Sequence, residues 1–396
     1  MKILYLGYWP SADGLTQSVI VPRLEILSRE DKVEEIFFCS VERENAGPLQ
    51  LNMSKVTQLF FHSKRKSNVF FTKCADFRGL FLLTNEIVRQ QKVSLVICNS
   101  PLAGMVGYNL HKKNNVPFIV ECFEPHALYM LETGAWKIWD PRYWVLTYSE
   151  WKQKKHAFKL ATVSRSYSEK LVKDGVPANK VVTVPNCIPL EDFKFKMASR
   201  TAKRAELDIG ENDCVGIYVG KFGDIYYDDE AFDLFAEAFN YFGKNFRLII
   251  LTSALSGAVI EKLKRRNISD EHFRIAHVPR EKVPDFLSAS DFAFSTIRPS
   301  PSRVYCCPIK NGEYWANGLP ILLEDGIGED SAIIREEGGG VLLERHHPDQ
   351  AFEQLTDLMK KNRPANANKI YSIAIKHRRM ELLSDYYKEL FDQPGF

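Results

Sequence analysis

The sequence lacks the features that would assign it to several common classes of protein. Its 396 residues contain no apolar run long enough to span a bilayer. The eight cysteines form no C-x-x-C pair and follow no regular spacing, which favours free thiols in a reducing compartment over a disulfide scaffold. Basic residues exceed acidic ones by only three, 53 against 50, so nucleic-acid binding is not expected as a main function. We therefore expect a cytoplasmic protein, either soluble or peripheral on a membrane.

Two further absences narrow the class. The G-x-G-x-x-G fingerprint is missing, which argues against a dinucleotide-dependent oxidoreductase. The N-terminal run MKILYLGYWP has no small-residue cleavage site, so it is typical of a first strand and not of a signal peptide.

Strand-like apolar runs alternate with amphipathic segments along the whole chain, which predicts βαβ units and parallel sheets. The length suggests two domains, and the charged stretch 194–211 has no strand character and is the expected linker. We expect an α/β protein with two Rossmann-like, doubly wound domains that face a cleft, at 1–193 and 212–369. The helical segment 370–396 should pack across the domain junction. The expected strands are 2–8, 35–41, 56–62, 93–99, 118–123, 160–163 and 181–184, followed by 215–220, 247–252, 273–277, 292–296, 320–323 and 341–343; the longest expected helices are 68–91 and 141–158.

The segment 306–322, CCPIKNGEYWANGLPIL, predicts a turn, a helix opened by Pro308 and a buried strand that begins at Pro320. Proline suits the first helical position, and the free N–H groups at a helix start can bind an anion such as phosphate. Glu313 and Asn317 share one face of this helix, four residues apart. An anion site beside a carboxylate is what a nucleoside diphosphate and its ribose diol require.

Two lysines are candidates for contact with the diphosphate. Lys221 follows the strand 215–220, at the carboxyl edge of the second sheet, where a cation could neutralise a diphosphate leaving group and Gly220 allows close approach of the backbone. The alternative is a lysine solvated in a loop. Lys310 stands in the first helical turn, against the positive end of the helix. Either an anion offsets it or its amine extends to solvent.

Four segments, in this order, resemble the nucleotide-sugar glycosyltransferases of the GT-B type, in particular the retaining family 4. They are KLATVSRSYSEKLVKDGVPANKVVTVPNCIPLEDF, YVGKF, VPREKVPDFLSASDFAFST and the segment from Pro308 to Pro320, which fills the pattern Pro-x-Lys-x-x-Glu-Tyr-x-Ala-x-Gly-x-Pro. The first segment has Pro185 and Asn186 where the family has Pro-Asn-Gly, but Cys187 replaces the glycine.

The resemblance implies roles for several residues. Glu313 would accept both ribose hydroxyls, and Asn186 and Arg303 would also lie on the donor side. His126 follows the fifth strand and would bind the sugar or stabilise charge as the leaving group departs; a purely structural histidine is the alternative. Gly14 and Thr16, in the loop SADGLTQS, would lie on the acceptor side. Glu121 and Glu124 are weaker candidates near His126.

The chain departs from the family pattern at two places. Tyr305 replaces the first Glu of Glu-x7-Glu, which puts sugar recognition in doubt. GDIYYDDEAF, with Tyr226 and Tyr227, lacks the second diphosphate-binding cation, which Lys310 or Arg303 could supply. The pair 228–229, two aspartates, is expected to cap the following helix and not to bind metal.

Four of the six tryptophans fall within 136–151, and lysines follow them. This pattern within 136–159 fits either a peripheral contact with an anionic membrane or a helix whose aromatic stripe packs in the core.

By this resemblance, the chain is expected to be a retaining hexosyltransferase of polysaccharide biosynthesis. It would move a sugar from a UDP- or GDP-linked donor to a hydroxyl of a glycan or lipid-linked acceptor, without metal or cofactor. A nucleotide-sugar epimerase on the same fold and a non-catalytic glycan-binding relative remain alternatives.

Overall fold

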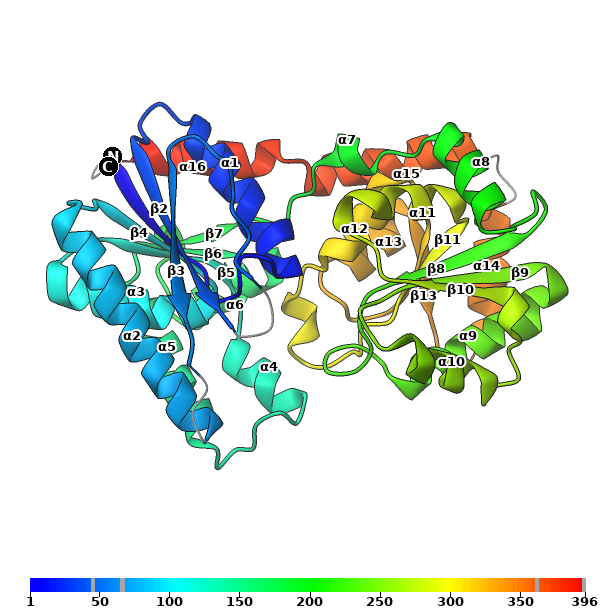
Figure 1. The fold of residues 1–396 in the computed structure, drawn as a ribbon, viewed down its shortest axis with the longest axis horizontal. Helices are drawn as coiled ribbons and strands as arrows, with labels where there is room; N and C mark the ends of the chain where they lie inside the picture. Colours follow the sequence, from blue (N-terminus) through cyan, green and yellow to red (C-terminus); the bar gives the residue numbers. More distant parts are fainter. Residues whose placement is uncertain (44–46, 65–67, 346, 360–362, 394–396) are drawn as a thin grey trace. The chain divides into compact units, whose positions relative to one another are not determined.

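The computed structural model describes residues 1–43, 47–64, 68–345, 347–359 and 363–393 (Figure 1). The chain forms two compact units: Met1–Pro185 with Glu381–Phe396 make unit 1, and Asn186–Met380 make unit 2. The boundaries of these two units differ from the boundaries of the expected domains. Some residues of the expected segments lie outside the described residues: 44–46, 65–67, 346 and 360–362 in the domains, and 394–396 in the C-terminal segment. The cleft between the domains stays a prediction.

Unit 1 is built on a parallel sheet of seven strands in the order β3-β2-β1-β4-β5-β6-β7 among its described residues. The centre of the sheet is buried on both faces, as the continuous apolar runs of a parallel sheet require. The strands are β1 (Lys2–Leu6), β2 (Glu35–Glu42), β3 (Val56–His62), β4 (Leu95–Asn99), β5 (Phe118–Phe123), β6 (Lys159–Thr162) and β7 (Val181–Thr183).

Helices cover both faces of this sheet. One face carries α1 and α16, which contact each other, while α2, α3 and α5 pack side by side on the other face (Figure 1). The helices and short turns are η1 (Thr16–Ile20), α1 (Val21–Arg29), α2 (Val69–Gln90), α3 (Ser100–Asn114), α4 (His126–Glu132), α5 (Pro141–His156), α6 (Arg165–Lys173), η2 (Ala178–Lys180) and α16 (Glu381–Phe391).

Unit 2 repeats the architecture with a parallel sheet of six strands, in the order β10-β9-β8-β11-β12-β13 within the described part of the chain. The strands are β8 (Cys214–Val219), β9 (Phe246–Leu251), β10 (Phe273–Ala276), β11 (Phe292–Ser295), β12 (Ile321–Glu324) and β13 (Gly340–Leu343). The helices and short turns are α7 (Leu190–Phe193), α8 (Met197–Glu206), α9 (Asp229–Phe242), η3 (Gly243–Asn245), α10 (Ser256–Lys264), η4 (Asp270–His272), η5 (Arg280–Lys282), α11 (Val283–Ala289), η6 (Arg303–Tyr305), α12 (Ile309–Ala316), α13 (Asp330–Glu337), α14 (Pro348–Met359) and α15 (Arg363–Arg378).

The two parallel α/β sheets confirm the predicted fold class. Each of the expected strands is present, with its ends shifted by two residues at most. Shifts of this size lie within the uncertainty of where any element begins and ends.

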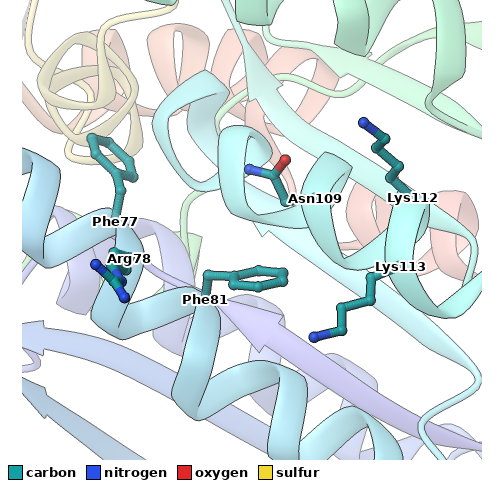
Figure 2. Close-up of a pocket in the computed structure, with 6 residues that line it drawn as sticks. All are labelled: Phe77, Arg78, Phe81, Asn109, Lys112 and Lys113. Atoms are coloured by element: carbon teal, nitrogen blue, oxygen red, sulfur yellow. The ribbon is translucent and has the colours of Figure 1, made fainter.

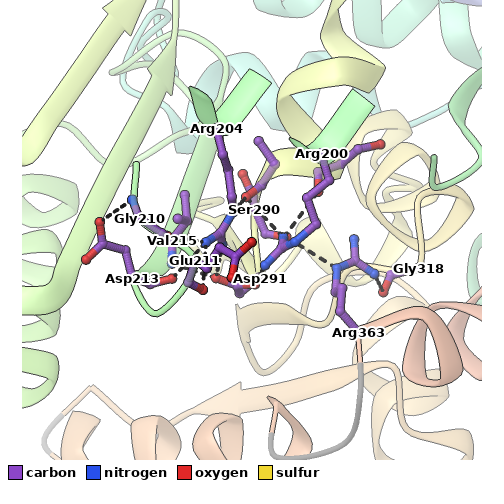
Figure 3. A network of polar contacts seen from close by, with 12 residues as sticks. Arg200, Arg204, Gly210, Glu211, Asp213, Val215, Ser290, Asp291, Gly318 and Arg363 are labelled. Carbon is purple, nitrogen blue, oxygen red and sulfur yellow. Dashed lines mark hydrogen bonds and ion pairs between the residues drawn. The ribbon is translucent and has the colours of Figure 1, made fainter. Parts of the chain in front are cut away.

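The expected linker contains an ordered helix of unit 2. Arg200 and Arg204 of α8 donate to the two carboxylate oxygens of Asp291 from 2.7 and 2.8 Å, and the Val215 N–H donates to the same carboxylate from 2.8 Å (Figure 3). Arg363 lies beside this group and donates to the Gly318 carbonyl from 2.8 Å. Burial lowers the pKa of Arg204, and it lowers that of Arg363 to about 9. One carboxylate therefore holds α8 against the start of β11.

The C-terminal helical segment is two helices, one in each unit. α15 belongs to unit 2, and its Arg378 carbonyl accepts from the Ile188 N–H at 2.7 Å. α16 belongs to unit 1, where Lys32 donates to the Phe391 carbonyl from 2.7 Å.

Candidate functional site

α12 follows η6 at the carboxyl edge of the unit 2 sheet, as its sequence predicts, but it begins one residue later than expected. Pro308 is the N-cap residue, and helical backbone starts at Ile309. The Pro308 side chain makes no cap hydrogen bond, and the first-turn N–H groups, which have no partner inside the helix, point out of its start. Gly318 ends the helix in a left-handed conformation (φ 69°), where a Cβ would lie 2.3 Å from the Cα of Ala367. A glycine is therefore required at this turn into β12.

Glu313 is a buried carboxylate on α12. Arg280 Nη1 lies 2.5 Å from its Oε1, and the same guanidinium lies 5.0 Å from the centre of the Phe193 ring. Burial raises the pKa of Glu313, while Arg280 opposes this shift. Glu313 is therefore not an ordinary exposed helical glutamate, because its carboxylate is buried and an arginine fixes its orientation.

Lys310, one turn before Glu313, reaches back over the end of β8. Its Nζ lies 2.3 Å from the position that a Cβ on Gly220 would occupy, and 4.3 Å from the centre of the Tyr226 ring. Gly220 has a φ of 153°, which a residue with a side chain rarely adopts. Lys310 is half-buried, and contact of its amine with an anion stays a prediction. The structure brings Lys310, Gly220 and Glu313 together at one edge of the unit 2 sheet.

Lys221 lies in the exposed loop after β8. Its Nζ contacts Asp224 at 2.6 Å, and both side chains are more than half exposed. The Tyr218 hydroxyl donates to the Lys221 carbonyl, which fixes the backbone here but not the amine. The role of Lys221 at the diphosphate stays a prediction.

Asn186 and Arg303 lie on segments that flank the start of α12. The Asn186 side-chain amide donates to the Cys307 carbonyl from 2.7 Å, while its Oδ1 is buried and has no hydrogen-bond partner in the part of the chain that the structure describes. Arg303 begins η6, is buried, and its carbonyl accepts from the Gly328 N–H at 2.8 Å. Tyr305, in place of the expected glutamate, ends η6.

The acidic pair before α9 is neutralised inside unit 2. Lys262 Nζ lies 2.5 Å from Asp228 and 3.3 Å from Asp229. Asp228 occupies the N-cap position, as predicted, but within the described residues its side chain makes no cap hydrogen bond, because the carboxylate accepts from Lys262. Lys262 offsets one of the two charges, and Arg266 Nη2 lies 3.7 Å from Asp229, so the pair is a weaker objection to a diphosphate nearby than the sequence suggested.

His126 is the first residue of α4 in unit 1, directly after β5. Its Nδ1 lies 3.3 Å from Glu124 Oε1. Behind it, the Ala127 N–H donates to Glu150 Oε1 from 2.9 Å, and burial raises the pKa of Glu150 to about 7. Cys122, at the end of β5, has a left-handed backbone (φ 50°) where the β5–β6 register shifts. Strained backbone of this kind often gathers at functional sites.

Glu121 is buried in the interior of unit 1. Arg23 Nε lies 3.2 Å from its Oε2, which also accepts from the Tyr5 hydroxyl at 2.8 Å. A carboxylate so placed ties α1 to the sheet, and we assign it a structural role.

Gly14 and Thr16 lie at the start of η1 in unit 1. A Cβ on Gly14 would meet open space, and the Gly14 carbonyl accepts from the Ser18 hydroxyl at 2.6 Å. Thr16 is fully buried, and among the described residues its hydroxyl has no hydrogen-bond partner. Contact of either residue with an acceptor stays a prediction.

No family model matches the sequence, and a search of curated proteins finds no match. Solved structures match over almost the whole chain. Sucrose-phosphate synthase from Thermosynechococcus elongatus has a TM-score of 0.79 at 12% identity, covering 99% of this chain and 98% of that one. Anabaena HepE in complex with UDP-glucose has a TM-score of 0.70 at 12% identity, covering 99% of each chain. The chain has the GT-B fold. UDP-GlcNAc 2-epimerase from Neisseria meningitidis, bound to UDP-GlcNAc, also matches, with a TM-score of 0.65 at 12% identity and coverage of 99% and 100%.

Two residues of this GT-B chain were missed at the sequence level. Arg280 lies within the quoted run VPREKVP, so the resemblance contained it, but nothing in the run pairs it with Glu313. Nothing in the sequence marks Glu150 as a buried carboxylate, because it stands among aromatic residues in the segment 136–159. Both are partners of predicted site residues, and their positions depend on tertiary packing.

Two negative findings apply to the GT-B chain as far as the structure describes it. No group of three His, Cys, Asp or Glu side chains is placed to hold a metal ion. None of the described helices is long and apolar enough to cross a membrane. The expected independence from metal stays a prediction.

Proposed function

We propose that this chain is a retaining glycosyltransferase that moves a sugar from a nucleoside-diphosphate donor to a hydroxyl of a glycan or glycolipid. The observation that carries the proposal is the position of Lys310 Nζ over Gly220, one helical turn from the buried carboxylate of Glu313. A cation and a fixed carboxylate, on a helix whose N-cap side chain makes no cap hydrogen bond, match the diphosphate and the ribose diol in charge. The eight free cysteines favour a reducing compartment such as the cytoplasm.

In the proposed reaction, the bond between the sugar C1 and the diphosphate oxygen breaks, and the acceptor oxygen forms the new bond to C1. The departing phosphate takes the acceptor proton. Lys310 would stabilise the charge that develops on this phosphate, with Lys221 as a second cation. His126 would contact the sugar. The protein thus acts by positioning and by electrostatic stabilisation, and its residues form no covalent intermediate.

The proposed hydrogen bonds between Glu313 and the ribose are tested by changing the residue and the nucleotide in the same experiment. UDP and 2′-deoxy-UDP are titrated by calorimetry into the parent protein and into Glu313→Gln. Hydrogen bonds to a charged partner contribute roughly 1.5–3 kcal/mol, so loss of the 2′-hydroxyl should weaken binding to the parent about tenfold or more. Loss of the 2′-hydroxyl should weaken binding to Glu313→Gln far less. GDP and 2′-deoxy-GDP are the second pair, because the base is not specified.

Lys310→Ala should weaken binding of the same nucleotide about tenfold or more, and should also lower transfer of radiolabelled sugar from the donor. Glu336→Gln and Lys282→Ala, which replace exposed side chains of unit 2, are the matched controls and should bind like the parent. An equal penalty for the 2′-deoxy ligand in parent and Glu313→Gln would refute the ribose assignment. Absence of binding by both nucleotides would refute the transferase.

An epimerase is the second candidate, since the UDP-GlcNAc 2-epimerase from Neisseria meningitidis has the same fold. Incubation with UDP-GlcNAc in D₂O separates the two. An epimerase that works by proton exchange would incorporate deuterium at C2 without any acceptor, whereas a transferase would leave C2 unlabelled.

A further inference from the structure

α5 is folded with its polar side inward. Leu146, Ser149, Glu150 and Gln153 are the buried residues of this helix. The Gln153 amide donates to the Pro101 carbonyl and to the Ser149 hydroxyl, each from 2.9 Å. A surface helix normally buries its apolar stripe and exposes the polar one. The reversal leaves the apolar side of α5 exposed to solvent.

The outward side of α5 carries large aromatic side chains. Trp144 is 56% exposed, Tyr148 59% and Trp151 50%, and Trp139, in the turn before the helix, is 77% exposed. The interpretation of the tryptophan segment as core packing is therefore wrong for these three tryptophans. Soluble monomers rarely expose such a contiguous apolar patch without a function. We call Trp139, Trp144, Tyr148, Trp151, Lys152 and Lys155 the α5 surface.

The charge on the α5 surface is of one sign. Lys152 Nζ lies 4.8 Å from the centre of the Trp151 ring and 5.3 Å from that of Tyr148, and Lys155 Nζ lies 5.7 Å from Trp151. Residues 136–159 contain six lysines and arginines but two carboxylates. Of these, Glu150 is buried and Asp140 is paired with Arg142. Burial lowers the pKa of His156, and the charges of Lys152 and Lys155 add to this shift.

The same face of unit 1 holds a basic hollow between α2 and α3, and α3 also packs against α5. The hollow has a volume of about 420 Å³ and is lined by Phe77, Arg78, Phe81, Asn109, Lys112 and Lys113 (Figure 2). Three of these side chains are cations and none is a carboxylate. Such a lining suits a phosphate group beside an acyl or glycerol moiety.

We propose that the α5 surface and the α2–α3 hollow dock unit 1 on a bilayer that contains anionic phospholipid. The aromatic rings would insert at the level of the headgroups, where tryptophan and tyrosine are favoured because one end is apolar and the other polar. The lysines would contact lipid phosphates. Charge complementarity selects this occupant over a second copy of the chain, because two such surfaces would repel each other.

The test uses vesicles of phosphatidylcholine, with and without 30% phosphatidylglycerol, and the full chain. The parent should sediment with the anionic vesicles but not with the neutral ones, and its tryptophan emission should shift to the blue. Lys152→Gln/Lys154→Gln/Lys155→Gln should weaken the partition coefficient about 100-fold. Trp139→Ser/Trp144→Ser/Trp151→Ser should weaken it about as much. Lys112→Gln/Lys113→Gln should also weaken it if the hollow takes a phosphate.

Unit 2 supplies the matched controls. Lys244→Gln/Lys264→Gln/Lys282→Gln replaces three exposed lysines, and Tyr241→Ser/Leu255→Ser replaces two exposed large apolar side chains. Both should partition like the parent. Circular dichroism and nucleotide binding confirm that each variant is folded. The proposal is overturned if the parent ignores anionic vesicles or binds neutral ones equally well. It is also overturned if the parent self-associates in solution and the tryptophan variant only abolishes that association.

Discussion

Replacing Asp291 by Asn is expected to lower the free energy of unfolding of unit 2 by about 3–5 kcal/mol. The carboxylate accepts from Arg200 and Arg204 of α8, and Arg363 lies beside it (Figure 3). An amide at this position leaves these buried guanidinium groups without a counter-charge, and its NH₂ group would face a donor. Native-state hydrogen exchange, read by mass spectrometry on peptides from α8 and β8, measures this free energy for unit 2 separately.

Asp270→Asn is the matched control in the same unit, because Asp270 forms an exposed pair with Lys264 at 2.7 Å. It should stay within about 0.5 kcal/mol of the parent. If Asp291→Asn exchanges as slowly as this control, the guanidinium cluster does not depend on the carboxylate, and α8 is held to the sheet by packing alone.

Replacing Glu150 by Gln is expected to stabilise unit 1 at pH 8 by up to about 3 kcal/mol, and to change little at pH 5. Burial raises the pKa of Glu150 from its usual 4.5 to about 7, although the Ala127 N–H and the charges of Lys154 and His126 oppose the shift. A raised carboxyl pKa means that the folded state holds the proton more tightly than the unfolded state. The stability that depends on this proton is complete below pH 4.5 and is lost as the pH rises through 7.

The glutamine variant keeps an oxygen that can accept from the Ala127 N–H but has no charge to bury, so it should lack this pH dependence. The measurement is the difference in free energy of unfolding between parent and variant across pH 5–8, from hydrogen exchange of α4 and α5 peptides. Glu169→Gln, at an exposed position of α6, is the control and should give a constant difference. A constant difference for Glu150→Gln as well would show that Glu150 is ionised throughout this range.

The fold could be predicted from the sequence because its signal is local. Each strand is a short apolar run between turn residues, and a doubly wound sheet needs little more than the alternation of such runs with helices. The position of Glu313 was predicted for the same reason, since Pro308 and Gly318 mark the two ends of its helix.

The sequence was a poor guide where a long-range partner decides the outcome. Periodicity shows that Trp144, Tyr148 and Trp151 share a face of α5, but not that this face turns outward. The inward side depends on Gln153, whose amide finds a carbonyl on α3. Asp228 was predicted to cap α9, but it pairs with Lys262, 34 residues later in the chain. The charged stretch 194–211 suggested a linker because Asp291, the partner of its Arg200, stands 91 residues later in the chain.

The chain path through the two units has a consequence for the order in which the protein folds during synthesis. Unit 2 is one continuous segment, whereas unit 1 needs residues from both ends of the chain. Tyr387 of α16 is fully buried beside Glu121 of β5, and burial and this carboxylate raise its pKa. While the ribosome is still translating α16, the buried ion pair of Arg23 and Glu121 lacks this cover. Unit 2 can therefore complete its core during translation, but unit 1 must wait for the last helix.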